Sequence, residues 1–195
     1  MKHLFFPLLL LAAACGSPQT ETPENAPEPE TGKTYADIIP AKDTLFCTSR
    51  GSFEYGKPYG YTNKAGDTVI PEGTFENCFS DLFTTFAYVS DKQFGEGMVA
   101  VNRNKELIFE AYIYDNGPDY INEGLFRIKR NGKIGYADLS GKIVIPAEYS
   151  CADPFENGKA RVALDCELIS DGEHTTAKSA HWFYIDQTGK KLMEH

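Results

Sequence analysis

The sequence predicts an all-β fold in which short antiparallel β-meanders or hairpins repeat in tandem and stack in a solenoid-like or sheet-like array. The first observation is internal repetition: KPYGYTNKAGDTVIPEGTF at 57–75 returns as NGKIGYADLSGKIVIPAEY at 131–149. Aligning these stretches without a gap matches Gly60 with Gly135, Tyr61 with Tyr136, Gly66 with Gly141, and Pro71 with Pro146. The second observation is that apolar and polar residues alternate over short runs, which is typical of half-buried strands. Repetition of such a pattern favours a repeat architecture.

The best-preserved copy, residues 124–157, predicts how one unit folds. Its first strand covers 125–128 and leads to Asn131-Gly132, a strong hairpin signal because both residues tolerate positive φ. The next strand ends at a second turn, Ser140-Gly141, and the third strand is expected to end at Pro146, which has no N–H for the ladder. One such meander is marginally stable in water, so stacked copies are needed to bury a shared apolar face.

Further segments are predicted to belong to other copies, which gives four units in all. Residues 97–101 and 158–162 begin with Gly and then alternate as 124–128 does, so each is expected to open a unit. After 97–101 the chain is expected to form a shortened copy, with Arg103-Asn104 at the place of Arg130-Asn131 and Phe109 at that of Tyr136. The outer copies are marked by residues 44–48 at one end and by Trp182, Tyr184 and Gly189 at the other.

These motifs resemble the WG-repeat family of bacterial proteins, whose units resemble G-x-A-x-V, then N-G-K-W-G-Y-I-D, then G-K-x-V-I-P. The resemblance covers roughly residues 55 to 192 and implies stacked β-repeats, but it implies no defined biochemical activity. The Trp-Gly pair that names the family is nowhere intact, and its Trp position is filled by Tyr59, Leu107, Ile134 and Trp182. Structural roles in turns and core are expected for the motif residues Gly60, Tyr61, Gly66, Pro71, Gly97, Gly124, Asn131, Gly132, Gly135, Tyr136, Gly141, Pro146, Gly158, Trp182, Tyr184 and Gly189.

Residues 1–14, MKHLFFPLLLLAAA, are expected to be a secretory signal, because a Lys precedes an apolar run too short to span a bilayer. Cys15 follows LAAA, which resembles the lipobox of bacterial lipoproteins, although Ala12 stands where that family usually has Leu. The resemblance implies diacylation of the Cys15 sulfur, cleavage before it and anchoring in a membrane. Gly16 replaces the Asp that retains enterobacterial lipoproteins in the inner membrane, which favours the outer membrane. A plain signal peptide with an incidental Cys is the alternative.

Residues 15–33 are expected to be the lipidated Cys and a disordered tether, since 16–33 holds four Pro and four Glu and no aromatic residue. Residues 34–195 then form one β-repeat domain. The formal net charge of −9, without a basic tract, excludes nucleic acid as a partner, because that affinity comes from Lys and Arg on phosphates. Contact with a membrane is therefore expected through the lipid anchor.

Four cysteines remain in the expected domain: Cys47, Cys78, Cys151 and Cys166. An exported chain meets an oxidising compartment, where an even number of cysteines indicates two disulfides. Spacing does not choose among the three possible pairings, and four buried thiols are the alternative. The absence of a CxxC pair argues against a zinc ribbon.

No motif for catalysis, for a metal or for a cofactor is found, so we expect a protein that is not an enzyme and needs none of them. Residues 115–119, DNGPD, hold oxygen ligands, but a turn explains them more simply than a calcium loop does. Core roles are favoured for Tyr61, Tyr136 and Tyr184 over a sugar-binding groove. We therefore expect a lipid-anchored binding or scaffolding module with an envelope protein or a glycan as partner. The alternative is a cell-wall (glycan)-acting envelope enzyme or an enzyme accessory.

Residues 163–181 are the stretch that the repeat explains least. Apolar residues alternate up to Asp171-Gly172, which predicts an extended hairpin. His174 and His181 are expected on its return strand, on opposite faces because their separation of seven is odd, which argues against one shared metal ion. We expect this hairpin to contact a partner and to be held at its base by a disulfide through Cys166.

Overall fold

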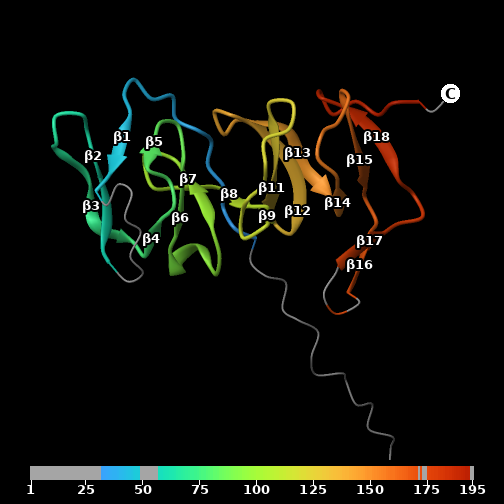
Figure 1. Ribbon diagram of the computed structural model, residues 1–195, viewed down its shortest axis with the longest axis horizontal. Coiled ribbons are helices and arrows are strands. Elements are labelled where there is room, and N and C mark those ends of the chain that lie inside the picture. Colours follow the sequence, from blue (N-terminus) through green and yellow to red (C-terminus); the bar gives the residue numbers. More distant parts are fainter. Residues whose placement is uncertain (1–31, 49–56, 171, 173–174, 194–195) are drawn as a thin grey trace, which may run out of the picture. The chain divides into compact units, whose positions relative to one another are not determined.

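The computed structural model describes residues 32–48, 57–170, 172 and 175–193. These residues form 18 β-strands in antiparallel sheets and one short 3₁₀ turn, η1 (Lys92–Phe94) (Figure 1). The all-β prediction is therefore confirmed. None of the helical segments in the described residues is long and apolar enough to cross a membrane. The predicted signal peptide, Cys15 and the tether up to residue 31 lie outside the described residues.

The strands build four repeat units, of which the first three have a first, a second and a third strand and the fourth has a first and a second strand. Repeat unit 1 is β1–β3, repeat unit 2 is β6–β8, and repeat unit 3 is β11–β13. Repeat unit 4 is β15 and β18, followed by residues 187–192, which fold back on β18. In chain order the strands are β1 (Leu45–Cys47), β2 (Tyr59–Thr62), β3 (Thr68–Phe75), β4 (Asn77–Cys78), β5 (Leu82–Phe83), β6 (Ala87–Ser90), β7 (Val99–Val101), β8 (Leu107–Ala111), β9 (Ile113–Tyr114), β10 (Gly117–Pro118), β11 (Leu125–Arg130), β12 (Lys133–Asp138), β13 (Ile143–Tyr149), β14 (Cys151–Ala152), β15 (Lys159–Ala163), β16 (Glu167–Ser170), β17 (Thr175–Lys178) and β18 (Phe183–Asp186).

Main-chain pairing joins each repeat unit to the next. Either the third strand itself or the short strand after it pairs with the first strand of the next unit: β8 pairs with β11, whereas β4 pairs with β6 and β14 with β15. The second of these joints fuses repeat units 2 and 3 into one seven-stranded sheet, ordered β13-β12-β11-β8-β7-β6-β4. Repeat unit 1 lies in the sheet β3-β2-β1-β5 and repeat unit 4 in the sheet β14-β15-β18, and the units follow one another in Figure 1.

A capped turn follows the second strand in every repeat unit. The turn begins with Asn or Asp, whose side-chain Oδ1 accepts a backbone N–H from two or four residues later at 2.8–2.9 Å. This side-chain bond replaces a backbone partner and fixes the turn locally. The capping residues are Asn63, Asn102, Asp138 and Asp186, and the residues of positive φ that close the turns are Gly66, Lys105, Gly141 and Gly189.

Repeat unit 2 starts earlier than the sequence predicts. Residues 97–101 were expected to open a unit, but β7 is a second strand that pairs with β6 before it. The capped turn at Asn102 shows that Arg103-Asn104 lies in the second turn of its unit, so it does not correspond to Arg130-Asn131. The sequence misleads here because Lys105, with a φ of 65°, takes the left-handed position that Gly fills elsewhere.

The corrected register also moves the family's Trp position in repeat unit 2. Met98 lies four residues before the capping Asn102, as Trp182 lies four residues before Asp186. Leu107 and Phe109 belong to the third strand, β8, so the positions predicted for them are wrong.

The glycine of the second strand lies against the backbone of the third strand. A Cβ atom on Gly135 would lie 2.6 Å from the carbonyl oxygen of Ile145 and 2.7 Å from the nitrogen of Ala147. A Cβ atom on Gly60 would meet the corresponding backbone atoms around Pro71. Only glycine allows this approach, which explains why the aligned segments share the Gly and Pro positions.

The third strand does not end at its proline, contrary to the prediction. The β12–β13 ladder is bulged: Tyr136 pairs with Ile145, but Ile134 pairs with Tyr149. β13 therefore continues through Pro146, because the bulge is a place where a residue without an N–H is tolerated. β3 contains Pro71 in the same arrangement.

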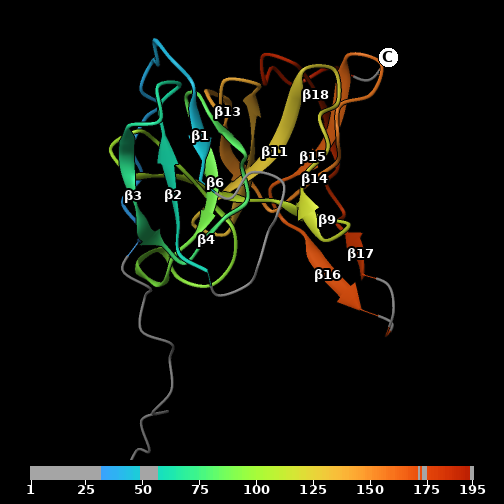
Figure 2. The ribbon, with the colours of Figure 1, turned by 60° about the vertical axis from the view of Figure 1, so that its left-hand side comes forward.

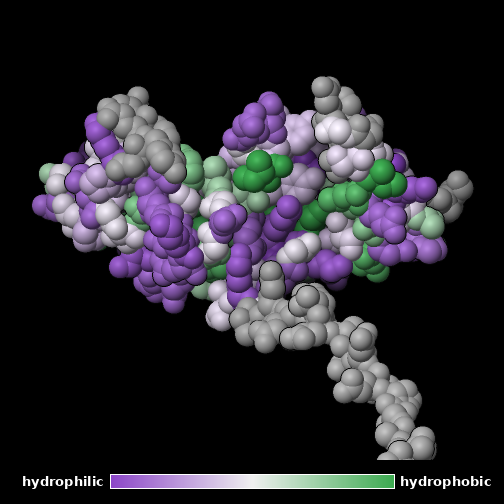
Figure 3. Space-filling model, turned by 90° about the horizontal axis from the view of Figure 1, so that it is seen from below, coloured by the Kyte–Doolittle hydropathy of each residue, from purple (hydrophilic) through white to green (hydrophobic). Residues whose placement is uncertain are grey.

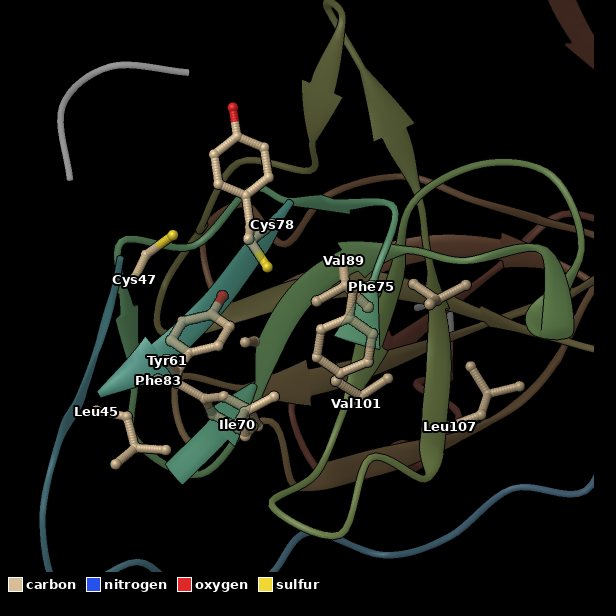
Figure 4. Packing of buried hydrophobic residues seen from close by; sticks show 13 residues of the cluster. Leu45, Cys47, Tyr61, Ile70, Phe75, Cys78, Phe83, Val89, Val101 and Leu107 are labelled. Carbon is tan, nitrogen blue, oxygen red and sulfur yellow. The ribbon is translucent and has the colours of Figure 1, made fainter. Parts of the chain in front are cut away.

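Two tyrosines at equivalent positions fill the cores of repeat units 1 and 3. Tyr61 and Tyr136 are buried, and each hydroxyl donates to a backbone carbonyl, at 2.9 and 2.7 Å. Their rings pack edge-on against Phe83 and Phe155, and Figure 4 shows the Tyr61–Phe83 pair inside its cluster. The predicted core role is confirmed for both tyrosines, whereas Tyr184 is only half-buried.

Residues 33–43 form a strap that lies across repeat units 2 and 3 without adding a strand. The hydroxyl of Tyr35 donates to Glu110 at 2.9 Å and accepts the backbone N–H of Asn131 at 2.7 Å. The guanidinium of Arg130 lies 4.9 Å from the centre of the Tyr35 ring. Lys33, which the sequence assigns to the tether, already pairs with Glu110 at 2.9 Å. The strap therefore ties the joint between the two units from outside the sheet.

Candidate functional site

Most predicted motif residues are structural, and repeat unit 4 carries an extra hairpin, β16–β17. Trp182 and Tyr184 are half-buried there, at the start of and within β18. Gly97 has a φ of 101° but lies in the loop before β7, outside the conserved turns of the array. The other turn residues all have positive φ. Gly66, Gly141 and Gly189 lie in the capped turns. Gly124 and Gly158 directly precede a first strand, and Asn131 and Gly132 form the turn between a first and a second strand.

In repeat unit 3 a tight turn joins the first and second strands. At the same place in repeat unit 4, between β15 and β18, the chain forms an extra hairpin. β16 and β17 pair over four positions, from Glu167 opposite Lys178 to Ser170 opposite Thr175, and form a separate two-stranded sheet. The predicted hairpin is confirmed. His181 lies beyond β17, so its predicted place on the return strand is wrong, and His174 lies outside the described residues.

A disulfide between Cys151 and Cys166 holds the base of this hairpin, as predicted for Cys166. Cys151 lies in β14, the strand that joins repeat units 3 and 4, and Cys166 directly precedes β16. Cys47 and Cys78 are buried thiols in this structure. An isolated two-stranded hairpin is marginally stable, so the covalent link supplies the support that a third strand would otherwise give.

The β16–β17 hairpin exposes apolar side chains. Leu168 is 68% exposed and Ile169 is 46% exposed, and as strand neighbours they point to opposite faces of the hairpin. Figure 2 shows the hairpin projecting away from the other sheets, and Figure 3 shows hydrophobic residues exposed within a largely hydrophilic face. Each face of the hairpin therefore exposes one large apolar side chain that a partner could contact.

An open cleft of about 600 Å³ lies beside the base of the hairpin. The guanidinium of Arg161 lies 4.3 Å from the Trp182 ring centre, and the ammonium of Lys191 lies 4.6 Å from that of Phe183. Such cation–π contacts hold the rings in place. The lining residues are Leu164, Asp165, Ala180, His181, Trp182, Phe183 and Lys191.

A Ser, a His and an Asp meet at the rim of this cleft, but not in the order that nucleophilic catalysis needs. Asp165 Oδ2 lies 2.8 Å from His181 Nδ1, and the hydrogen bond with His181 holds the pKa of the Asp165 carboxyl below its ordinary value. The Ser179 hydroxyl donates to Asp165 at 3.2 Å and accepts the backbone N–H of His181 at 2.9 Å. A triad requires the Ser hydroxyl on the other His nitrogen. The group therefore braces the chain at the cleft rim.

A buried ion pair stabilises the neighbouring loop 112–121. Arg127 and Asp119 are 2.6 Å apart, and their side chains are 7% and 2% exposed. Arg127 also donates to the Ala152 carbonyl in β14 and lies over the Tyr112 ring. The sequence predicted a simple turn at Asp119 and assigned no partner to Arg127, so this pair was missed. The signal in the sequence was weak: Arg127 is a charged residue within an alternating strand, and Asp119 is an acid eight residues before it.

No group of three or more His, Cys, Asp or Glu side chains in the described part of the chain is placed to hold a metal ion. The two carboxylates of the 115–119 stretch have other partners: Asp115 accepts from the Tyr120 hydroxyl at 3.0 Å, and Asp119 pairs with Arg127. The arrangement at repeat unit 4 can thus offer apolar contact, aromatic rings and a few polar groups, which suits binding.

Comparison with known proteins agrees with the repeat fold. Residues 100–133 and 134–165 each match the family model described as WG containing repeat. Residues 100–165 therefore carry two WG-containing repeats, and the family resemblance read from the motifs is confirmed over this part of the chain. Searches of curated proteins and of solved structures gave no match.

The buried ion pair generates a prediction for stability. Asp119→Ala leaves the Arg127 guanidinium buried without its carboxylate, so we expect the free energy of unfolding to fall by about 3–5 kcal/mol. Asp165→Ala is the matched control, because it removes an acid from an exposed pair with His181 and should leave the unfolding midpoint nearly unchanged. Urea unfolding measures both variants. Equal midpoints for the two variants would show that the Arg127 pair does not stabilise the fold.

Proposed function

We propose that this chain is a lipid-anchored envelope protein whose repeat domain acts as a non-catalytic binding module. Export and anchoring are supported by the LAAAC junction at 11–15 and by the Pro- and Glu-rich segment after it, which would hold the domain away from a membrane. The outer membrane is the expected location. The domain itself then needs no membrane contact of its own, in agreement with its acidic charge.

The observation that carries the binding role is the β16–β17 hairpin, which exposes one large apolar side chain on each face and has its base fixed by the Cys151–Cys166 disulfide. A prearranged element loses little conformational freedom on binding, so more of the contact energy appears as affinity. The hairpin also has two strand edges that pair with no other described strand, and a partner strand can add to such an edge. We therefore favour a protein of the envelope as the partner.

A glycan is the second candidate, because the cleft beside the hairpin combines Trp182 and Phe183 with the polar groups of Asp165 and His181. Aromatic rings with a few directed polar groups are typical of small-molecule sites. The cleft is open, and no base in it is aligned with a nucleophile, which favours binding over the alternative of a cell-wall-acting enzyme.

The binding role is tested by capture from the native envelope. The double variant Leu168→Asp and Ile169→Asp places charges on both hairpin faces, so we expect chemical crosslinking to recover the protein partner at least tenfold less well than with the wild type. Leu139→Asp is the matched control, because Leu139 is 61% exposed in the capped turn of repeat unit 3 and should not change recovery.

The outcomes separate the candidates. Undiminished recovery with the double variant contradicts the hairpin as the contact element. Loss of binding to cell-wall glycan in Trp182→Ala, with protein capture intact, would favour the glycan candidate. Cell-wall turnover that is lost in His181→Ala while capture persists would favour the enzyme.

The lipid anchor has its own test. When cells are fed with labelled palmitate, we expect the wild-type protein to become labelled. The variant Cys15→Ser should stay unlabelled, because no sulfur remains at the cleavage site to accept the lipid. Cys166→Ser, which removes a different cysteine, should keep it. Equal labelling of wild type and Cys15→Ser would rule out lipidation at this residue.

A further inference from the structure

Cys47 and Cys78 come from different strands but end in the same place. Cys47 is the last residue of β1 and Cys78 the last of β4, and they are 4% and 6% exposed. Cys47 lies opposite Tyr61 in the β1–β2 ladder, and its backbone N–H donates to the Asp81 carbonyl at 2.9 Å. The chain just after Cys78 therefore crosses the end of β1. Figure 4 shows both sulfur atoms beside Tyr61.

Both thiols belong to one buried core cluster, together with Tyr61. Burial, together with the neighbouring Cys47, raises the pKa of the Cys78 thiol to about 12. A thiol with such a pKa stays protonated at neutral pH and reacts slowly, because the thiolate is the nucleophile. In the folded domain this pair is thus adjacent but unreactive.

Cys78 lies one position further along its joint strand than Cys151 does, because Cys78 pairs with Val89 as Ala152 pairs with Val162. β4 and β14 are both joint strands, which pair with the first strand of the following unit. Cys151 is already disulfide-bonded to Cys166, which follows the first strand of repeat unit 4 by three residues. Cys47 ends the first strand of repeat unit 1. Each cysteine pair therefore lies between a joint strand and the end of a first strand, which belongs to the following unit for Cys166 and to the preceding unit for Cys47.

We propose that Cys47 and Cys78 are a second disulfide site of this protein, oxidised by a disulfide-carrying dithiol oxidant of the envelope. One cysteine thiolate attacks a sulfur of the oxidant's disulfide and releases one oxidant thiol. The second cysteine thiolate then attacks the mixed disulfide, forms the Cys47–Cys78 bond and releases the other oxidant thiol. Two electrons and two protons pass to the oxidant, which becomes a dithiol.

The burial of both thiols sets the order of events. The oxidant must reach them before repeat unit 1 closes, while the thiols are exposed and ionise near the ordinary value of about 8.5. Once the reduced domain has folded, oxidation should be slow. The bond would fix β1 to the joint between repeat units 1 and 2, as the Cys151–Cys166 bond fixes the joint between repeat units 3 and 4. In cells, the reaction rests on the export proposed above.

Refolding tests the pairing without relying on export. The full chain carrying Cys15→Ser is reduced, denatured and refolded in a mixture of reduced and oxidised glutathione, and its thiols are then counted with maleimide under denaturing conditions. We expect none of the four thiols to react, and we expect peptide mapping to recover Cys47 linked to Cys78 and Cys151 linked to Cys166. The matched variant Cys47→Ser should leave one reactive thiol, at Cys78, with the other disulfide unchanged.

Two reactive thiols at Cys47 and Cys78 after refolding, or a link from either to Cys151 or Cys166, would overturn the proposal. The wild-type protein isolated from its native envelope gives the second measurement, since it folded under cellular conditions. A Cys47–Cys78 bond there supports the proposal even if the refolded variant aggregates. A bond that forms in refolding but is missing from the native protein would count against export and not against the pairing.

Discussion

The close approach of a second-strand glycine to the Ile-Pro peptide of the third strand is the constraint on which repeat units 1 and 3 depend. At Gly135 the two backbones are near enough that a Cβ atom would overlap the Ile145 carbonyl. The contact lies at a bulge, and a bulge bends its strand. The bent β13 then delivers β14 to β15, so the geometry inside repeat unit 3 positions repeat unit 4. Repeat unit 1 uses Gly60 in the same way.

The sequence predicted the features that are set locally. Asn131-Gly132 specifies its hairpin through backbone conformation, and the insertion of 163–181 alternates strongly enough to reveal β16 and β17. Repeat unit 2 was misread because Asn102 and Lys105 make the capped turn without a glycine. The strap through Tyr35 and the Arg127–Asp119 pair were not predictable, because each depends on residues that only the folded chain brings together.

The repeat also accounts for where a binding element can be added. The capped turns and joints are needed by every unit, whereas the hairpin turn between the first and second strands only reverses the chain. Repeat unit 4 enlarges that turn into β16–β17 without disturbing β15 or β18, which still pair over four positions. Function in such a protein is expected on loops that a rigid scaffold positions. The Cys151–Cys166 disulfide extends that scaffold to the base of the hairpin.

Urea unfolding of Gly135→Ala against Gly117→Ala tests the central constraint most directly. Neither glycine needs a left-handed φ, and a Cβ atom at Gly117 would meet nothing within 4 Å, so the two substitutions differ only in the space available. We expect Gly135→Ala to lower the free energy of unfolding by about 1–3 kcal/mol or more, because the atoms it meets are backbone and cannot move aside. Gly117→Ala should stay within about 0.5 kcal/mol of the wild type. A Gly135→Ala protein as stable as Gly117→Ala would contradict the claim that this contact organises the repeat.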